Sequence, residues 1–110
     1  MNKSIYYLFD QFVFRNLKKI SYGYLEIKDA RGKLHFFGDP KSILKSKIKI
    51  NDPSFTSKLI RKGSSGLGES YINNEFETDD LPSLIELSAK NINITYKFSG
   101  FLEINWVKNF

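Results

Sequence analysis

The sequence predicts an α+β fold in which a small, mostly antiparallel sheet packs against helices. Three observations predict it: an apolar pattern at helical spacing over residues 4–17, three alternating strand-like runs between residues 22 and 50, and two further helical segments after residue 52. The chain has 110 residues, of which 41% are hydrophobic and 15% aromatic. That length and composition fit one domain with its own core.

The first element is an amphipathic helix from about Ser4 to Leu17. Its apolar residues recur at i, i+3, i+4, i+7 and i+8, namely Ile5, Leu8, Phe9, Phe12 and Val13. Such a helix can pack on its own sheet or lie on a membrane. Packing on the sheet is favoured, because the polar face lacks the strong positive charge that is typical of membrane-surface helices.

Three strands follow this helix. The alternation predicts strands over residues 22–28, 33–37 and 44–50, with a turn over residues 29–32. In the last strand, Lys45, Lys47 and Lys49 share one face, so this strand is expected to be half exposed and protected by its charges from edge pairing. The order of the strands predicts a meander with one exposed face.

Two short helices are expected in the second half of the chain. Asp52 and Pro53 are typical of a helix start and Gly63 of a helix end. Residues 79–80 are aspartates that would cap a second helix over residues 81–90. The expected apolar side of that helix consists of Leu81, Leu84, Ile85 and Ser88, with Leu87 beside them.

The segment from Asn91 to Phe110 fits two patterns. Apolar residues alternate as in a strand at Ile92, Ile94, Tyr96 and Phe98. A helix is equally consistent with the spacing of Ile94, Phe98, Phe101, Leu102 and Asn105. Large apolar residues such as Trp106 near the end of the chain suggest that something packs there.

The stretch from Gly63 to Tyr71 is the most distinctive part of the sequence. It lacks the lysine that follows the last glycine of a phosphate loop, and a helix rather than a strand is expected before it, which argues against a dinucleotide fingerprint. A tight turn with positive φ angles is therefore the favoured interpretation, and a loop that cradles a ligand is the alternative.

Four runs of the chain resemble the N-terminal region of cyclopropane-fatty-acyl-phospholipid synthases. They are Asn51-Asp52-Pro53-Ser54-Phe55, Gly63-Ser64-Ser65-Gly66-Leu67-Gly68-Glu69-Ser70-Tyr71, Asn74-Glu75-Phe76 and Asp79-Asp80-Leu81. The resemblance covers about residues 17–100, and its central G-L-G-E-x-Y motif is fairly specific. Three positions depart from the family: Asn73-Asn74 stands for an Asp-Gly turn, Phe76 for a tryptophan, and Lys62-Gly63 for paired glycines.

The resemblance implies that residues 1–100 are an N-terminal domain and that residues 101–110 begin a linker or a terminal helix. The order of the elements also resembles sterol-carrier-protein-like lipid-binding domains. In the family, the chemistry belongs to a C-terminal methyltransferase domain that binds S-adenosylmethionine and transfers a methylene group to an unsaturated acyl chain of a membrane phospholipid. The resemblance therefore carries no catalytic residue, cofactor site or metal site to this chain, and no activity of the chain alone is expected.

The resemblance and the charge pattern suggest contacts with a catalytic methyltransferase domain or with an anionic phospholipid surface. The candidate contact residues are Gly66, Leu67, Gly68, Glu69, Tyr71, Lys47, Lys49 and Trp106. The carboxylate of Glu69 can either bind backbone N–H groups of its turn or meet a partner. The lysines can either touch lipid headgroups or form an ordinary solvated face.

Other classes of function are less well supported. The chain has no cysteine, which excludes thiolate chemistry and disulfides and suits a reducing cytosol. His35, the single histidine, has no acidic residue at ligand spacing, so a structural or surface role is favoured. The net charge of +5 attracts anions, but the aromatic residues are not interleaved with the basic ones, which makes a nucleic-acid binder improbable.

The expected location is the cytoplasm, with peripheral contact to the inner membrane face. No signal peptide and no apolar run long enough to span a bilayer is visible in the sequence. The alternative function is a stand-alone binding module that carries an apolar ligand in its own core or binds a partner protein. The sequence leaves the oligomeric state open.

Overall fold

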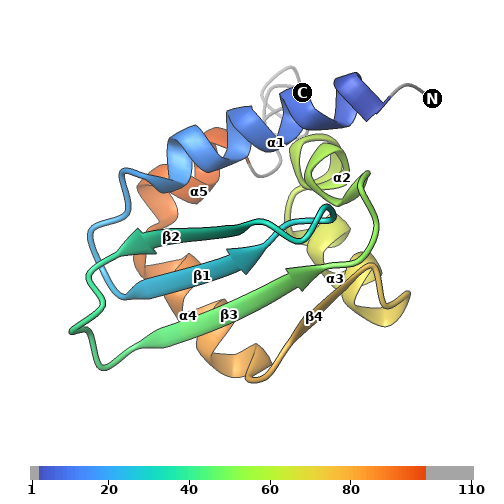
Figure 1. Ribbon diagram of the computed structural model, residues 1–110. Helices are drawn as coiled ribbons and strands as arrows, with labels where there is room; N and C mark the ends of the chain where they lie inside the picture. Colours follow the sequence, from blue (N-terminus) through green and yellow to red (C-terminus); the bar gives the residue numbers. More distant parts are fainter. Residues whose placement is uncertain (1–2, 99–110) are drawn as a thin grey trace, which may run out of the picture.

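A computed structural model describes residues 3–98 and has the predicted α+β architecture (Figure 1). In chain order, its elements are α1 (Lys3–Leu17), β1 (Tyr24–Lys28), β2 (Leu34–Gly38), β3 (Lys45–Ile50), α2 (Phe55–Lys62), α3 (Ser64–Ile72), β4 (Phe76–Thr78), α4 (Leu81–Lys90) and α5 (Ile92–Phe98). The strands form one mixed sheet, and the helices pack against one of its faces. The likeness to sterol-carrier-type domains stays a prediction.

The prediction of a meander is wrong. The strand order is β2-β1-β3-β4, and β3 pairs with β1 in parallel, while β1–β2 and β3–β4 are antiparallel. β3 is therefore an interior strand, and its lysines do not guard an edge. The connection after β2 crosses back over the start of β1 at Gly38, where φ is 86° and an added Cβ would lie 2.2 Å from the carbonyl oxygen of Gly23. Alternation alone does not reveal which strand is the neighbour.

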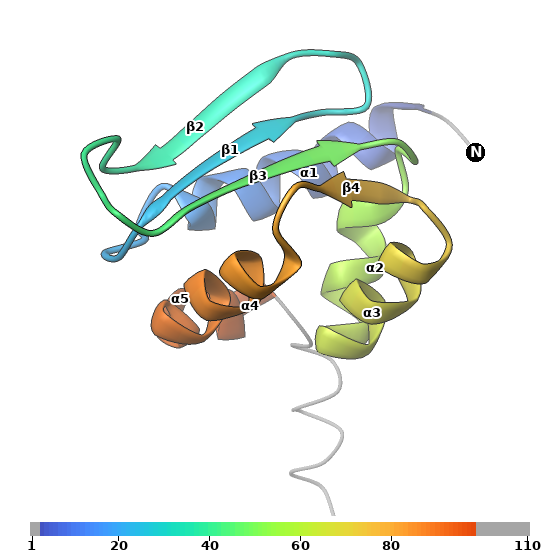
Figure 2. The same cartoon turned by 90° about the horizontal axis from the view of Figure 1, so that it is seen from below.

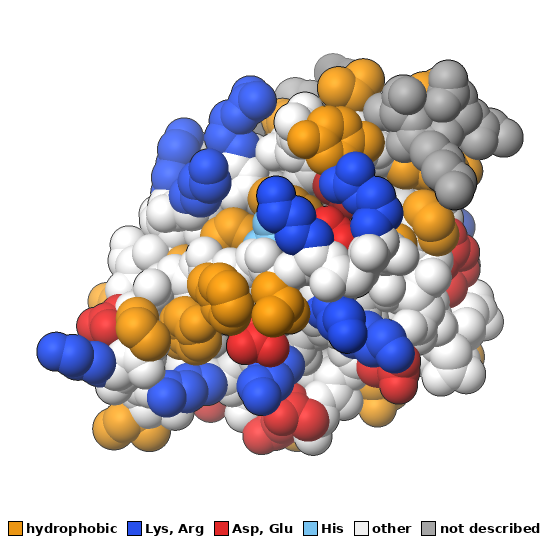
Figure 3. Space-filling model, viewed as in Figure 1, with side chains coloured by type: hydrophobic (Ala, Val, Ile, Leu, Met, Phe, Trp, Pro, Cys, Tyr) orange, Lys and Arg blue, Asp and Glu red, His pale blue; other side chains and the backbone are white. Residues whose placement is uncertain are grey.

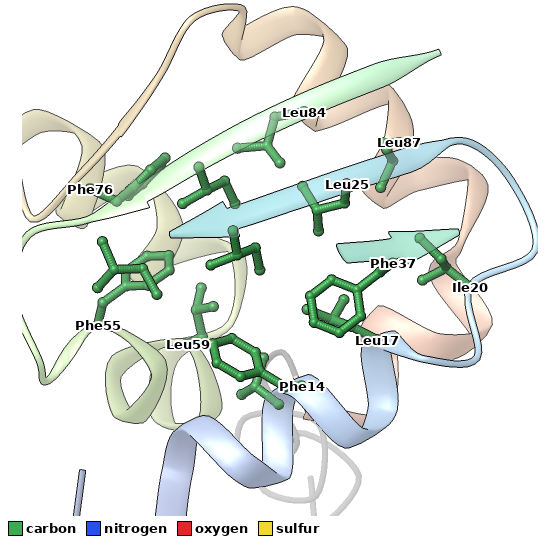
Figure 4. Close-up of a cluster of buried hydrophobic side chains, with 14 of the residues drawn as sticks. Phe14, Leu17, Ile20, Leu25, Phe37, Phe55, Leu59, Phe76, Leu84 and Leu87 are labelled. Atoms are coloured by element: carbon green, nitrogen blue, oxygen red, sulfur yellow. The ribbon is translucent and has the colours of Figure 1, made fainter. Parts of the chain in front are cut away.

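The prediction of one exposed sheet face is confirmed. The helices lie on a single side of the sheet (Figure 2), and Lys45, Lys47 and Lys49 are exposed on the other. The inward side chains meet those of the helices in a single core, part of which is drawn in Figure 4. Among the members of this core are Phe14, Leu17, Leu25, Phe37, Phe55, Phe76, Leu84 and Leu87.

The helix α1 packs against α2 and α5 along the β2 side of the molecule. Its buried residues are Val13, Phe14 and Leu17, and the ring centroid of Phe14 lies 5.8 Å from that of Phe37 in β2, so the predicted packing on the sheet is confirmed. The predicted apolar side is rotated, however, because Ile5, Leu8 and Phe12 are exposed. The apolar residues of this helix occupy more of its circumference than the core covers, which leaves a second apolar stripe outside.

The helix α2 begins later than predicted, at Phe55. The carboxylate of Asp52 accepts hydrogen bonds from the backbone N–H and the hydroxyl of Ser54, at 2.9 and 2.8 Å, and so forms a turn before the helix. In α4, Asp80 is a cap as predicted, since it accepts from the backbone N–H of Ser83. Ile85 is exposed, contrary to prediction, because Leu84 and Leu87 face the core.

The glycine-rich stretch is a helix, not a turn. Within it only Gly63 has a positive φ, of 59°. The reason for the second glycine is contact between helices: an added Cβ at Gly66 would lie 2.7 Å from the carbonyl oxygen of Lys58 in α2. The close approach of α3 to α2 thus overrides the low helix propensity of glycine. After α3, Asn74 adopts the left-handed geometry expected there, with φ 57°.

The segment after α4 is helical as far as the structure describes it, since α5 covers Ile92–Phe98. This excludes the strand alternative for these residues. The expected linker or helix over residues 101–110, including Trp106, lies outside the described residues. None of the helices within residues 3–98 has the length and hydropathy that crossing a bilayer requires.

Candidate functional site

The motif residues singled out from the sequence are dispersed around α3. Gly66 is buried against α2, and Leu67 lines an apolar cavity in the core. Gly68 and Tyr71 are exposed. The carboxylate of Glu69 accepts a hydrogen bond from Nζ of Lys62 at 3.0 Å instead of binding backbone N–H groups of a turn. This contact lowers the pKa of Glu69.

The predicted lysines lie elsewhere. Lys47 and Lys49 point from β3 to the open face of the sheet, opposite the helices. Nζ of Lys49 is 3.9 Å from a carboxylate oxygen of Glu77 on β4, and both side chains are largely exposed. The fold therefore does not bring the α3 motif and the lysine strand together in one site, and the sequence-predicted candidates form two separate surfaces.

The structure instead gathers charged groups between α1 and the β1–β2 hairpin, in a cavity of about 240 Å³. Its lining residues are Tyr7, Asp10, Gln11, Phe14, Arg15, Lys18, Arg31, Lys33, His35 and Phe37. We call it the α1–hairpin cavity. In Figure 3 the single histidine, in pale blue, lies among Lys and Arg side chains, with hydrophobic side chains above it.

Asp29, at the end of β1, organises the hairpin side of this cavity. Its Oδ1 accepts hydrogen bonds from the backbone N–H groups of Arg31 and Lys33, each at 2.9 Å, and its Oδ2 lies 2.8 Å from Nε2 of His35. Burial alone would raise the pKa of Asp29, but the hydrogen bonds from His35, Lys33 and Arg31 outweigh it and lower this pKa. The side chain is thus a buried carboxylate that is held ionised.

The partner of His35 was missed from the sequence. Register pairs His35 with Ile27, which places Asp29 two residues further along the neighbouring strand, a diagonal neighbour within reach. This register is known from the structure, since the turn predicted over residues 29–32 would instead set Lys28 opposite Lys33 and His35 opposite Glu26. The imidazole is also held from α1, since its ring centroid lies 4.4 Å from that of Phe14. A structural role of this kind agrees with the favoured interpretation of the histidine.

A second carboxylate, Asp10 of α1, lies on the opposite wall. Its Oδ1 accepts a hydrogen bond from Oγ1 of Thr56 in α2 at 2.6 Å. Burial raises the pKa of Asp10, with a further contribution from the charge of Asp29, and this outweighs the lowering effect of the Thr56 hydrogen bond. No sequence pattern connects two residues that are 46 positions apart.

Four cations line the same cavity: Arg15 from α1, Lys18 directly after it, and Arg31 and Lys33 from the hairpin. The guanidinium of Arg31 lies 4.5 Å from the ring centroid of Tyr7, and one of its nitrogens is 3.8 Å from Asp29. Because the carboxylates are buried and the cations are not, the cavity presents positive charge outward. Such an arrangement is suited to binding an anion.

The cavity shows no sign of a metal centre. Within residues 3–98, no group of three or more His, Cys, Asp or Glu side chains is placed to hold an ion. Its lining also contains no serine, threonine or cysteine that His35 could activate as a nucleophile.

A second cavity, of about 190 Å³, lies in the core between the sheet and the helices. Its lining is mostly aliphatic and includes Val13, Leu17, Leu25, Ile27, Ile48, Leu59, Leu67, Leu84, Leu87 and Ile92. A dry cavity of about 150 Å³ with such a lining is large enough to hold a benzene molecule. The core thus has room for a small apolar group.

Comparison of the chain with models of protein families, with curated proteins and with solved structures gives no match. The predicted kinship with cyclopropane-fatty-acyl-phospholipid synthases therefore stays a prediction. What can be said of function comes from the motif residues quoted above, from the two cavities and from the surface of α1.

Proposed function

We propose that this chain is a non-catalytic, lipid-associated accessory domain that works with the catalytic domain of a cyclopropane-fatty-acyl-phospholipid synthase-like methyltransferase. It would hold that domain at the surface of an anionic phospholipid membrane, where the acyl substrate is. S-adenosylmethionine would be bound by the catalytic domain. The observation that carries the proposal is an exposed apolar stripe on α1 that continues into a row of cations.

The apolar stripe consists of Ile5, Leu8 and Phe12, which are 42%, 62% and 42% exposed. Their spacing of three and four residues puts them along one side of α1. A helix of a globular domain normally turns such a side toward the core, and the core side of α1 is already supplied by Val13 and Leu17. Contiguous exposed apolar side chains of this kind mark an interaction surface.

Positive charge adjoins this stripe. Arg15 follows Leu8 and Phe12 at i+7 and i+3, so it extends the same side of the helix. Lys18, Arg31 and Lys33 lie close by, around the α1–hairpin cavity. An apolar stripe beside cations is complementary to the surface of an anionic bilayer, where each Lys or Arg contributes about 1 kcal/mol. We therefore assign this surface to anionic phospholipid rather than to a neutral protein.

Co-sedimentation with vesicles tests the membrane contact. The protein should bind vesicles of phosphatidylcholine with phosphatidylglycerol and should bind pure phosphatidylcholine much more weakly. Leu8→Glu and Phe12→Glu should each weaken binding about tenfold or more, because a charge replaces a buried apolar contact. Ile85→Glu is the matched control, since Ile85 is 53% exposed on a different helix, α4.

Equal loss of binding in the control and in the α1 variants would contradict the proposal, as would equal binding to neutral and anionic vesicles. Circular dichroism of each variant shows whether the fold is kept. The accessory role has a separate test, which is to mix the protein with a separately expressed catalytic domain of this family. Absence of a complex at high micromolar concentration would end that part of the proposal.

The apolar core cavity favours a second candidate function, a module that binds an apolar ligand. A fluorescent fatty acid is a direct probe of the cavity, and Leu67→Trp should abolish its binding by filling the space that Leu67 lines. Ile72→Trp is the control, because Ile72 is exposed at the end of the same helix and does not line the cavity. No binding to the unmodified protein would exclude this candidate.

A further inference from the structure

Two of the three arginines of the chain line the α1–hairpin cavity. The chain has 17 Lys and Arg residues, and only Arg15, Arg31 and Arg61 are arginines. A guanidinium group binds phosphate oxygens through two parallel hydrogen bonds, whereas an ammonium group acts as a point charge. In a chain that otherwise uses lysine, the placement of Arg15 and Arg31 at one cavity points to a ligand with oxyanion chemistry.

The acids of the cavity leave this positive charge available. Both oxygens of Asp29 are engaged by the hairpin itself, through two backbone N–H groups and His35, and the ion pair of Asp29 with Arg31 is long, at 3.8 Å. Asp10 is buried and bound by Thr56. Among residues 3–98, neither Arg15 nor Lys18 nor Lys33 forms a salt bridge. An anion that enters the cavity would therefore find cations that are not already neutralised.

The cations approach from two independent elements. Arg15 lies in the last turn of α1 and Lys18 directly after this helix, while Arg31 and Lys33 come from the hairpin. An anion between the two walls would therefore meet positive charge from both sides.

The volume of the cavity limits the size of the ligand that it can hold. A volume of about 240 Å³ is below the range of about 300–1,000 Å³ that is typical of drug-sized ligands. It suits a single small group. The inner wall is also preorganised, because Asp29 and Phe14 fix the imidazole of His35 from two sides.

We propose that the α1–hairpin cavity binds a phosphate group, with Arg15 and Lys18 on one side of it and Arg31 and Lys33 on the other. The inference rests on the proposed function in one respect: the phosphate would be that of a phospholipid headgroup, whose acyl chains would then meet the stripe of Leu8 and Phe12 next to Arg15. Free phosphate and soluble phosphate esters share the same chemistry and are distinguished by the test.

The site is tested by NMR titration of the ¹⁵N-labelled protein with inorganic phosphate and with glycerol 3-phosphate, at constant ionic strength. Chemical shifts should move in α1 and in the hairpin. Arg15→Gln and Arg31→Gln should each weaken binding about tenfold or more, because a charge-assisted contact is lost. Arg61→Gln is the matched control: it removes the same charge from the third arginine, which is exposed on α2 and does not line the cavity.

Vesicles distinguish the source of the phosphate. If binding to phosphatidylglycerol-containing vesicles falls with Arg31→Gln as well as with Arg15→Gln, but not with Arg61→Gln, the ligand is a lipid headgroup, because Arg15 alone also adjoins the apolar stripe. If the cavity binds soluble phosphate and the protein ignores vesicles, the site stands and the membrane function fails. The inference is overturned if the protein binds vesicles and the three arginine variants bind equally well. It is also overturned if phosphate changes no chemical shifts around the cavity. Neither result would contradict the proposed membrane contact of the α1 stripe. Arg15 is the decisive position, since its exposed side chain supports no described contact of the fold.

Discussion

Two regions of the molecule differ in how much their sequences reveal. One is the pair of contacting helices α2 and α3 (residues 55–72), which we call the α2–α3 corner, and the other is the α1–hairpin cavity. The corner contains the most recognisable motif of the chain, yet its central glycine, Gly66, serves close contact between helices. The cavity contains no motif, yet it is lined by four cations and the buried carboxylate of Asp10, with the buried Asp29 behind His35. The difference shows that a recognisable motif can be required for helix packing. A charged site can be formed by residues that no sequence motif connects.

The largest effect is expected at Gly66 in the corner. Gly66→Ala should lower the free energy of unfolding by about 3 kcal/mol, because its Cβ would lie 2.7 Å from a backbone oxygen of α2 that cannot move freely. Gly68→Ala is the control, since nothing lies within 4 Å of its added Cβ, and it should raise stability by up to about 1 kcal/mol. Urea denaturation measures both. Similar free energies of unfolding for the two variants would contradict the close contact between Gly66 and α2.

The next effect is expected in the cavity, at Asp29. Asp29→Asn keeps an oxygen for the two backbone N–H groups but loses the charge that faces His35, so stability at neutral pH should fall by about 1–2 kcal/mol. The pKa of Asp29 is lowered by folding, so its contribution is present above the unfolded value of about 3.9 and is lost as pH falls through the folded one. The two proteins should therefore converge in acid. A constant difference down to pH 2 would contradict this assignment.

Asp10 should behave in the opposite sense. Burial raises the pKa of Asp10, so its ionised form opposes folding at neutral pH, and the protein gains stability as pH falls through that pKa. Asp10→Asn keeps an acceptor for Thr56 and should stabilise the protein at pH 7 by up to about 1 kcal/mol, with a flatter pH profile. Thermal unfolding between pH 4 and pH 8 checks the sign. A destabilised variant would show that the carboxylate is needed as a charge.

The smallest effect on stability is expected at Glu69 in the corner. Its side chain and that of Lys62 are both about half exposed, and ion pairs of this kind contribute little. Glu69→Gln should leave the melting temperature unchanged while it weakens any complex with a catalytic domain of the family. Lys62→Gln is the companion variant, since it breaks the same ion pair from the other side. A clear loss of stability in either variant would assign the pair to the fold instead.

Local sequence patterns were sufficient to predict much of the fold. The alternation of the strands, the helical spacing of α1 and the cap at Asp80 are short-range features, and the structure has them at the predicted places. The neighbours of β3 were not predictable in the same way, because alternation identifies which side chains face inward but not which strand lies alongside. The crossing at Gly38 decides this, through a close approach to Gly23.

The candidate sites likewise divide into features that are local in the sequence and contacts between distant elements. The hairpin that contains Asp29 and His35 was predicted from the sequence, but the register that brings the two side chains together came from the structure. The contact between Asp10 and Thr56 and the convergence of Arg15 with Arg31 were not predictable, because each joins elements that are distant in the chain. In α3, low glycine propensity argued for a turn, and packing against α2 prevailed.

The sequence by itself determined the fold class, the inward faces of the strands, the hairpin and the cap at Asp80, because backbone geometry and burial translate directly into spacing along the chain. Only the tertiary structure decided the strand order, the helical state of the glycine motif, the outward stripe of α1 and the cation-lined cavity beside it. These features depend on which elements pack against each other across the core. The free energy of that packing comes from contacts between residues that are distant in the sequence and that no local pattern connects.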